Sequence, residues 1–180
     1  MSDPIRILGL DPGTRLTGYG VIDARPDDPL RPVLVDGGVI RLDEKSALCD
    51  RLCELERELE SLILEVKPAV VAVEEIYAHY NHPKTAIIMA HARGVMLLVA
   101  RRNHLPVLEF AANRVKQSLT GHGHAGKESM QRAIQAQWHL AQPPDPPDVA
   151  DALAVALCCA RSGALADILT LPIQQAAPAL

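Results

Sequence analysis

Four acidic residues stand at positions from which they could hold metal ions together. Asp11 and Glu74 each follow an apolar run, and Asp148 and Asp151 lie three residues apart in a predicted helix. That spacing puts the two aspartates on one helical face, about 5–6 Å apart. Clustered carboxylates repel one another unless cations lie between them, and Mg²⁺ or Mn²⁺ prefers oxygen ligands. Two such ions could stabilise the attacking and leaving oxygens of a phosphoryl displacement.

Each carboxylate could also have a purely structural role, but such a role explains Asp151 least well. Asp11 precedes Pro-Gly and could be a turn residue, Glu74 could be solvated in a loop, and Asp148 could only cap a helix. Asp151, however, interrupts the apolar run 149–157 on a helix expected to be buried. An unpaired charge there is costly, so Asp151 requires a cation or a hydrogen-bond partner.

The elements that must position these residues follow from hydrophobic periodicity. Apolar runs predict strands, and apolar residues at three- and four-residue steps predict helices. We expect strands over 5–10, 16–22, 32–42, 69–73 and 105–110, and helices over 45–66, 83–103, 113–119, 127–139 and 145–161. Turn signals stand at 26–29 and at Gly37-Gly38. Short links join the first three strands, so we expect them to form an antiparallel meander. Strands separated by helices pair in parallel. The order of elements therefore predicts an α/β fold with a five-stranded mixed sheet and helices on both faces.

Composition places the chain among globular proteins of one domain. Its 180 residues are 48% apolar and 22% charged, and no apolar stretch approaches the roughly 20 residues of a membrane span. The N-terminal apolar run is too short for a signal peptide, so we expect a cytoplasmic protein. Residues 162–180 carry one charge, Asp167, and two prolines. We expect a domain over 1–161 and a flexible C-terminal tail over 162–180.

The cysteines and one helix give further expectations. Cys49, Cys53, Cys158 and Cys159 lack zinc-site spacing, and we interpret them as reduced, buried thiols on helices. Residues 95–100 are apolar on all sides of the predicted helix, which indicates burial in the core or at a subunit interface.

The charge is divided unevenly along the chain. A net charge of −4 argues by itself against a nucleic-acid partner. Residues 79–132, however, carry eight Lys and Arg against Glu109 and Glu128, a local charge of +6 that leaves −10 for the remainder. The basic stretch could meet a phosphate backbone, and two divalent ions at the four carboxylates would bring the total to zero.

Several segments, in the same order along the chain, resemble the RuvC family of Holliday-junction resolvases. They are 8–20 (LGLDPGTRLTGYG), 72–77 (AVEEIY), 91–94 (HARG), 106–112 (PVLEFAA), 115–118 (VKQS), 121–123 (GHG) with Lys127, and 148–154 (DVADALA). The resemblance implies a ribonuclease-H-like fold. It also implies a homodimer that nicks two strands of like polarity in a four-way DNA junction during recombination and repair, together with a branch-migration helicase complex.

The resemblance also assigns roles to individual residues. Asp11, Glu74, Asp148 and Asp151 match the family's metal-binding tetrad, which implies two Mg²⁺ ions per subunit, with Mn²⁺ as a possible substitute. One ion would activate water and the other would stabilise the leaving 3′ oxygen. Lys116 and Lys127 match two basic residues near the scissile phosphate, where they stabilise the transition state or only position the phosphate. The predicted DNA contacts are Tyr77, Arg93, Arg114, Lys116, His122 and Lys127, with Tyr77 stacking where the family usually has Phe. For His122 a plain surface-loop position is the favoured interpretation, and a phosphate contact is the alternative.

Three other functions fit part of the pattern. An ATPase of the actin/Hsp70 group also has Asp-x-Gly-Thr after its first strand, but it needs two lobes and a second glycine-rich loop. A related nuclease could act on another branched nucleic acid, although the segments from Tyr77 to Lys127 argue against it. A junction-binding module without enzymatic activity would not need the four carboxylates.

Overall fold

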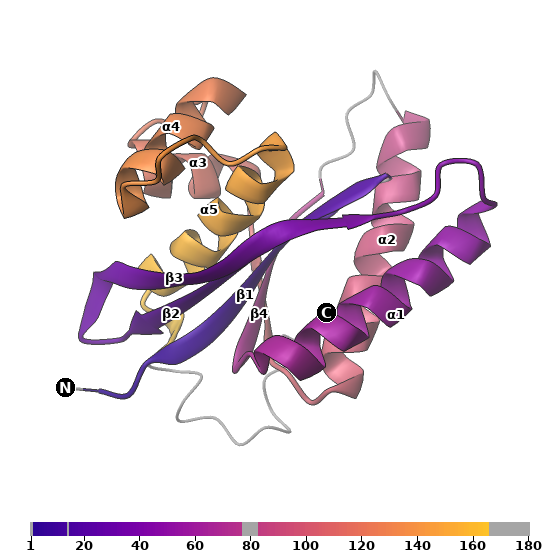
Figure 1. Cartoon of the computed structure of the whole chain (residues 1–180), viewed down its shortest axis with the longest axis horizontal. Helices are drawn as coiled ribbons and strands as arrows, with labels where there is room; N and C mark the ends of the chain where they lie inside the picture. Colours follow the sequence, from indigo (N-terminus) through magenta and orange to yellow (C-terminus); the bar gives the residue numbers. More distant parts are fainter. Residues whose placement is uncertain (1, 14, 77–82, 166–180) are drawn as a thin grey trace.

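One mixed sheet of five strands organises the computed structural model, which describes residues 2–13, 15–76 and 83–165 (Figure 1). Its elements in chain order are β1 (Ile5–Asp11), β2 (Leu16–Arg25), β3 (Asp28–Arg41), α1 (Leu48–Val66), β4 (Val70–Glu74), α2 (Pro83–Arg102), β5 (Val107–Phe110), α3 (Ala112–Thr120), α4 (Lys127–Trp138) and α5 (Pro147–Arg161). The strand order is β3-β2-β1-β4-β5. The β1–β2 and β2–β3 pairs are antiparallel, and the β1–β4 and β4–β5 pairs are parallel. The predicted α/β fold with a mixed sheet is confirmed.

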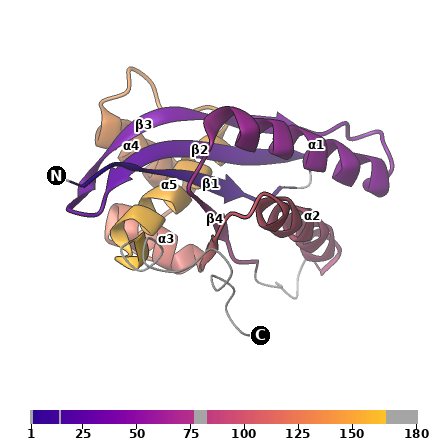
Figure 2. The same ribbon diagram turned by 90° about the horizontal axis from the view of Figure 1, so that it is seen from below.

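Helices cover both faces of the sheet, α1 and α2 on one side and α3, α4 and α5 on the other (Figures 1 and 2). Side chains of β1 alternate between these layers because successive residues of a strand point to opposite faces. Ile5 and Ile7 pack in the cluster that contains α5, whereas Leu8 and Leu10 pack in the cluster that contains α1 and α2. Asp11 continues the first series, so β1 delivers it to the α5 side.

Two glycines let α5 lie directly on the sheet. A Cβ added to Gly18 would stand 2.1 Å from the Asp148 carbonyl oxygen, and one on Gly9 would stand 2.3 Å from the Ala152 carbonyl oxygen. No side chain larger than hydrogen fits between these backbones. Every residue of α5 from Val149 to Ala160 is buried except Asp151, as expected for its apolar sequence.

The predicted turn at Gly37-Gly38 is wrong, because both glycines lie inside β3. They pair with Gly20 and Tyr19 of β2. A Cβ on Gly38 would approach the Tyr19 hydroxyl oxygen to 2.7 Å. Packing against an aromatic ring, rather than a reversal of the chain, therefore favours glycine there. The signal at 26–29 is confirmed as the link between β2 and β3.

Two other expectations need correction in part. Cys158 and Cys159 are buried as predicted, but Cys49 and Cys53 are exposed because they lie on the outer side of α1. Leu165 is 2% exposed and packs in the α5 cluster, so residues 162–165 lie against the domain rather than in a free tail. The rest of the expected tail, 166–180, lies outside the described residues.

The apolar helix α2 is only partly covered within the described chain. Met96, Val99 and Ala100 are buried against the sheet and α1, but Leu98 is 55% exposed and Ile87 is 57% exposed. These two residues lie eleven positions apart, which is three turns, and therefore share one stripe of the helix. None of the described helices combines the length and hydropathy that crossing a membrane requires.

Candidate active site

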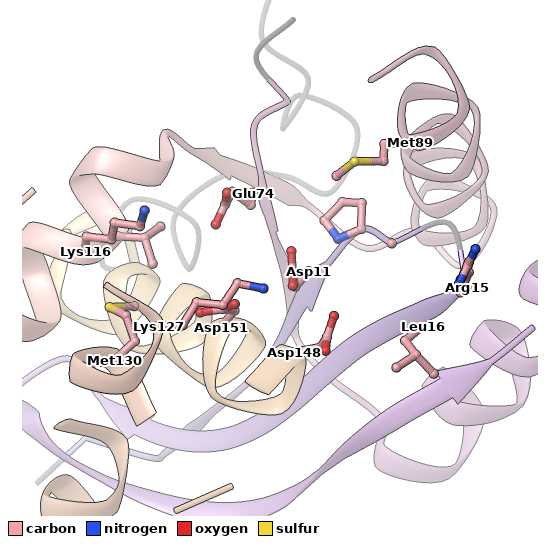
Figure 3. A pocket seen from close by; sticks show the side chains of 13 residues that line it. Asp11, Arg15, Leu16, Glu74, Met89, Lys116, Lys127, Met130, Asp148 and Asp151 are labelled. Atoms are coloured by element: carbon pink, nitrogen blue, oxygen red, sulfur yellow. The ribbon is translucent and has the colours of Figure 1, made fainter. Parts of the chain in front are cut away.

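A cavity of about 500 Å³ opens where β1 and β4 end and α5 begins (Figure 3). Its lining includes all four predicted metal ligands and both predicted lysines: Asp11, Glu74, Lys116, Lys127, Asp148 and Asp151. Residues up to 140 positions apart in the chain thus meet in one site. Neither the cavity beside β3 nor the one between α3 and the end of α5 contains a comparable set of titratable groups.

Strand pairing and helix geometry place the carboxylates. Parallel register between β1 and β4 aligns Leu10 with Val73, so that Asp11 and Glu74 leave the sheet at the same edge. Asp148 lies in the first turn of α5 and Asp151 one turn later, both aimed at this edge (Figure 3). The start of α5 also carries a positive helix-dipole end, which favours an acid in the first turn.

Mutual repulsion and burial make these carboxylates difficult to ionise. Burial raises the pKa of Asp11 well above its usual range, and Glu74, Asp151 and Asp148 raise it further. Burial and the charge of Asp151 raise the pKa of Glu74 to about 7. Burial also raises the pKa of Asp151, with a contribution from Asp148. Carboxylates so disfavoured as anions require a cation nearby.

The two lysines supply part of that positive charge. Lys116 projects from α3 and Lys127 from the first turn of α4, on the same side of the carboxylates (Figure 3). Lys127 lowers the pKa of Asp11, Lys116 lowers that of Glu74, and both oppose the rise at Asp151. Their charges do not balance the site, because the pKa values of all three acids stay raised.

The donor set fits hard divalent cations. Within the described residues, none of the four carboxylates forms an ion pair within 4 Å, and all present oxygen atoms to one cavity. No three His, Cys, Asp or Glu side chains in the described residues are yet close enough to hold one ion. Ligation of one ion by three of these carboxylates therefore needs side-chain rotation toward a common centre.

The opposite wall of the cavity contains residues that the sequence analysis did not single out. Arg15, Leu16 and Met89 lie on the far side of Asp11 from the lysines (Figure 3). Arg15 is mostly exposed and forms an ion pair with Glu44 at 3.3 Å. Arg15 lies four residues after Asp11 in the sequence, and this proximity could have indicated that it lines the same cavity. The sequence around Met89 gives no such indication, because the position of Met89 depends on how α2 crosses the sheet.

The remaining predicted DNA contacts do not line this cavity. Arg93 forms an ion pair with Glu109 of β5, and Arg114 lies over the Phe110 ring, 5.4 Å from its centroid. His122 is exposed in the loop between α3 and α4, where its backbone N–H donates to the Thr120 hydroxyl. These residues stay predictions as DNA contacts. Tyr77 lies outside the described residues.

Part of the basic stretch is neutralised by neighbouring acids. Besides Arg93, the structure pairs Arg102 with Glu56 and Arg132 with Glu128. Among the described residues, the other basic side chains of the stretch have no ion-pair partner within 4 Å, and they are Lys84, Arg101, Arg114, Lys116 and Lys127. Three of these five cations lie on α3 or at the start of α4, and the other two, Lys84 and Arg101, lie on α2.

This sheet order, with carboxylates at the ends of β1 and β4 and on α5, defines a ribonuclease-H-like nuclease. A family model described as Crossover junction endodeoxyribonuclease RuvC matches residues 7–159. Curated RuvC proteins from Caldicellulosiruptor saccharolyticus and Moorella thermoacetica are 42% and 44% identical over 154 and 152 residues. These alignments cover 86% and 84% of this chain and 91% and 89% of the relatives.

Solved structures agree with this result. Thermus thermophilus RuvC in complex with a Holliday junction substrate superposes with a TM-score of 0.81 at 30% identity, covering 90% of this chain and 96% of that one. The yeast mitochondrial Holliday junction resolvase Ydc2 superposes with a TM-score of 0.63 at 16% identity, covering 92% and 81%, and shares the fold. The chain therefore belongs to the RuvC family of Holliday junction resolvases, which are DNA-hydrolysing, metal-dependent nucleases. The ATPase alternative is set aside.

Proposed function

We propose that this protein binds four-way DNA junctions and nicks two strands of like polarity at the cavity between β1, β4 and α5. The observation that carries the proposal is the convergence of four carboxylates and two lysines on one open cavity. The carboxylates suit cations and the lysines suit phosphate, so the two halves of the site together accommodate a phosphodiester and its metal ions.

We assign the metal-ligand role to Asp11, Glu74, Asp148 and Asp151, with Mg²⁺ as the ion and Mn²⁺ as a substitute. Two ions held there would supply hydroxide for attack on phosphorus and stabilise the leaving 3′ oxygen. The raised pKa values of Asp11, Glu74 and Asp151 support this assignment, because a bound cation reverses the penalty for ionising them.

Lys116 and Lys127 have a separate role beside the acids. Both point toward the carboxylates from one side (Figure 3), so a phosphate held beside the carboxylates would lie within reach of both ammonium groups. Their ammonium groups orient that phosphate and offset the charge that accumulates on its oxygens in the transition state. Lys116 is half-buried and Lys127 exposed, so Lys116 is the more constrained of the two.

A symmetric pair of nicks requires two active sites, and α2 offers a surface for a second copy of the chain. Ile87, His91, Gly94 and Leu98 lie at steps of three and four residues on its exposed side. Two such stripes packed together would bury the apolar side chains that the single chain leaves in water. The cytoplasmic location remains a prediction that rests on the sequence, and the helicase complex remains one that rests on the family resemblance.

Nick mapping on synthetic DNA tests the proposal. Each strand of a four-way junction is end-labelled in turn and incubated with protein in Mg²⁺, in Mn²⁺ or in EDTA, beside a linear duplex of the same sequence. We expect symmetric nicks in two strands of like polarity, no nicks in EDTA and an intact duplex. Equal nicking of the duplex would overturn junction specificity, and nicking in EDTA would overturn the metal requirement.

A further inference from the structure

A second, smaller cavity of about 220 Å³ lies between α3 and the end of α5, apart from the carboxylate cavity. Arg114, Gln117, Ser118, Cys158, Arg161 and Ser162 line it. This lining contains two guanidinium groups, two hydroxyls and an amide, and no carboxylate. Its volume is below the roughly 300 Å³ at which pockets for drug-sized ligands begin, so it suits a small group.

Arg161 has no counter-charge among the described residues. Its Nη1 donates to the Ser118 carbonyl oxygen at 2.6 Å, and its Nη2 donates to the Gln137 side-chain oxygen at 2.8 Å. Its Nε is buried and has no hydrogen-bond partner among the described residues, none of which forms an ion pair with this guanidinium. A half-buried charge held only by neutral acceptors favours binding of an anion.

Arg114 adds a second cation to the lining. It is exposed, yet its guanidinium lies over the Phe110 ring. Cys158 forms a buried wall of the cavity, and burial raises the pKa of its thiol despite the opposing effects of Arg114, Ser118 and Arg161. The thiol therefore stays neutral and does not compete with a ligand for the two arginines.

We infer that this cavity is a phosphate-binding subsite formed by Arg114 and Arg161, which takes a backbone phosphate of the bound DNA away from the scissile bond. The inference rests on the proposed function. α3 and α5 lie side by side (Figure 2) and carry residues of both cavities. Cys158 follows Asp151 by seven residues, or about 10 Å along α5 and on the same helical face. A DNA strand whose backbone crosses α3 from the carboxylate cavity would therefore reach the second cavity.

Binding as a function of salt tests the subsite without relying on catalysis. A fluorescent four-way junction is titrated with protein in EDTA over a series of NaCl concentrations. Arg114→Gln removes one cation, and Gln117→Glu places an anion in the lining at an exposed position. The matched controls make the same charge changes at exposed residues outside the cavity, Arg57→Gln on α1 and Gln142→Glu before α5. Arg161 is left intact, because it also links α3 to α4.

The subsite predicts a specific change in the salt dependence. Arg114→Gln should weaken junction binding by roughly fivefold to tenfold and reduce the slope of log Kd against log salt by about one. Gln117→Glu should weaken binding as much, and neither control should change it. Variants that match their controls while the native protein binds junctions would overturn the subsite alone. A native protein that binds no junction would overturn the proposed function itself.

A second measurement separates DNA phosphate from a free phosphate ion. The Tm of native protein and of Gln117→Glu is recorded in inorganic phosphate and in chloride at equal ionic strength. We expect no stabilisation by millimolar phosphate beyond that in chloride, because a single phosphate loses the contacts that the rest of the DNA makes. A phosphate-dependent rise in native Tm, combined with an unchanged salt slope for Arg114→Gln, would overturn the assignment to DNA.

Discussion

The two faces of the sheet hold their helices in different ways. On one face, α5 lies so close that its backbone meets Gly9 and Gly18 of the strands. On the other face, α1 and α2 are held by buried side chains such as Leu59 and Met96, and their outer sides remain in water. Two of the four carboxylates come from the helix with backbone contact, and none comes from α1 or α2.

This difference explains where chemistry can be placed in this fold. A helix held through its backbone cannot shift by rearranging rotamers, so the backbones of Asp148 and Asp151 keep fixed positions relative to Asp11. A helix held by side chains can absorb substitutions by repacking. We therefore expect changes on the α5 face to affect activity more than stability, and changes on the α1 face to do the reverse.

The largest expected effect comes from the carboxylate at the centre of the site. Asp11→Asn keeps the shape but removes a charge that the metal ions need, and should lower the nicking rate by about a thousandfold or more. Junction binding in EDTA should remain. The control is Asp50→Asn on the exposed side of α1, which should nick like the native protein. Nicking by purified Asp11→Asn in Mg²⁺ at the native rate would contradict the metal assignment.

A steric change tests the backbone contact next. Gly18→Ala puts a Cβ against the Asp148 carbonyl and forces α5 away from the sheet. We expect nicking to fall by about a hundredfold, because displacements near 1 Å carry such costs, and stability to fall by about 1–3 kcal/mol.

Ile63→Val is the matched change on the α1 face, at a buried residue. It should cost about 1 kcal/mol and leave nicking per folded molecule unchanged. If Gly18→Ala lost stability but nicked at the native rate, the proposed difference between the two faces would be wrong.

The exposed stripe of α2 gives the third prediction. Leu98→Glu introduces a charge into the surface proposed for a second copy and should raise the dimer dissociation constant by roughly thirtyfold or more, measured by analytical ultracentrifugation. Leu64→Glu on α1, where the native leucine is 62% exposed, is the control and should leave the dimer intact. A native protein that sediments as a monomer at all concentrations would refute the α2 interface.

The smallest effect concerns the stability of the metal-free protein. The pKa of Glu74 is about 7 in the folded chain and about 4.3 for an unfolded glutamate. The folded state therefore binds the proton more tightly, and the associated stability is lost as pH rises from about 4 through 7.

Glu74→Gln removes this loss. At pH 8 in EDTA the variant should melt roughly 2–8 °C above the native protein, and at pH 5 the difference should shrink. Glu58→Gln on α1 should show no such trend, since Glu58 is only a surface residue paired with Arg57. A native Tm that rises from pH 5 to pH 8 relative to Glu74→Gln would show that the sign is wrong.

Local patterns were sufficient to predict the fold and to single out the four carboxylates, whereas Lys116 and Lys127 were predicted only from the family resemblance. Short stretches of sequence are enough to recognise β1 and β4 as apolar strands and Asp151 as a charge within an apolar helix. Contacts between distant segments could not be predicted in this way. Gly38 is a turn signal in the sequence, but it accommodates the Tyr19 ring in the fold. The pairing of Arg93 with Glu109 likewise depends on how α2 crosses β5.

Anomalous scattering from crystals soaked in Mn²⁺ tests the central claim most directly. The account predicts two peaks in the cavity, each within ligand distance of oxygens from Asp11, Glu74, Asp148 or Asp151, and the loss of at least one peak in Asp11→Asn. Crystals of native protein with no peak in this cavity, or with Mn²⁺ bound only elsewhere on the chain, would contradict it.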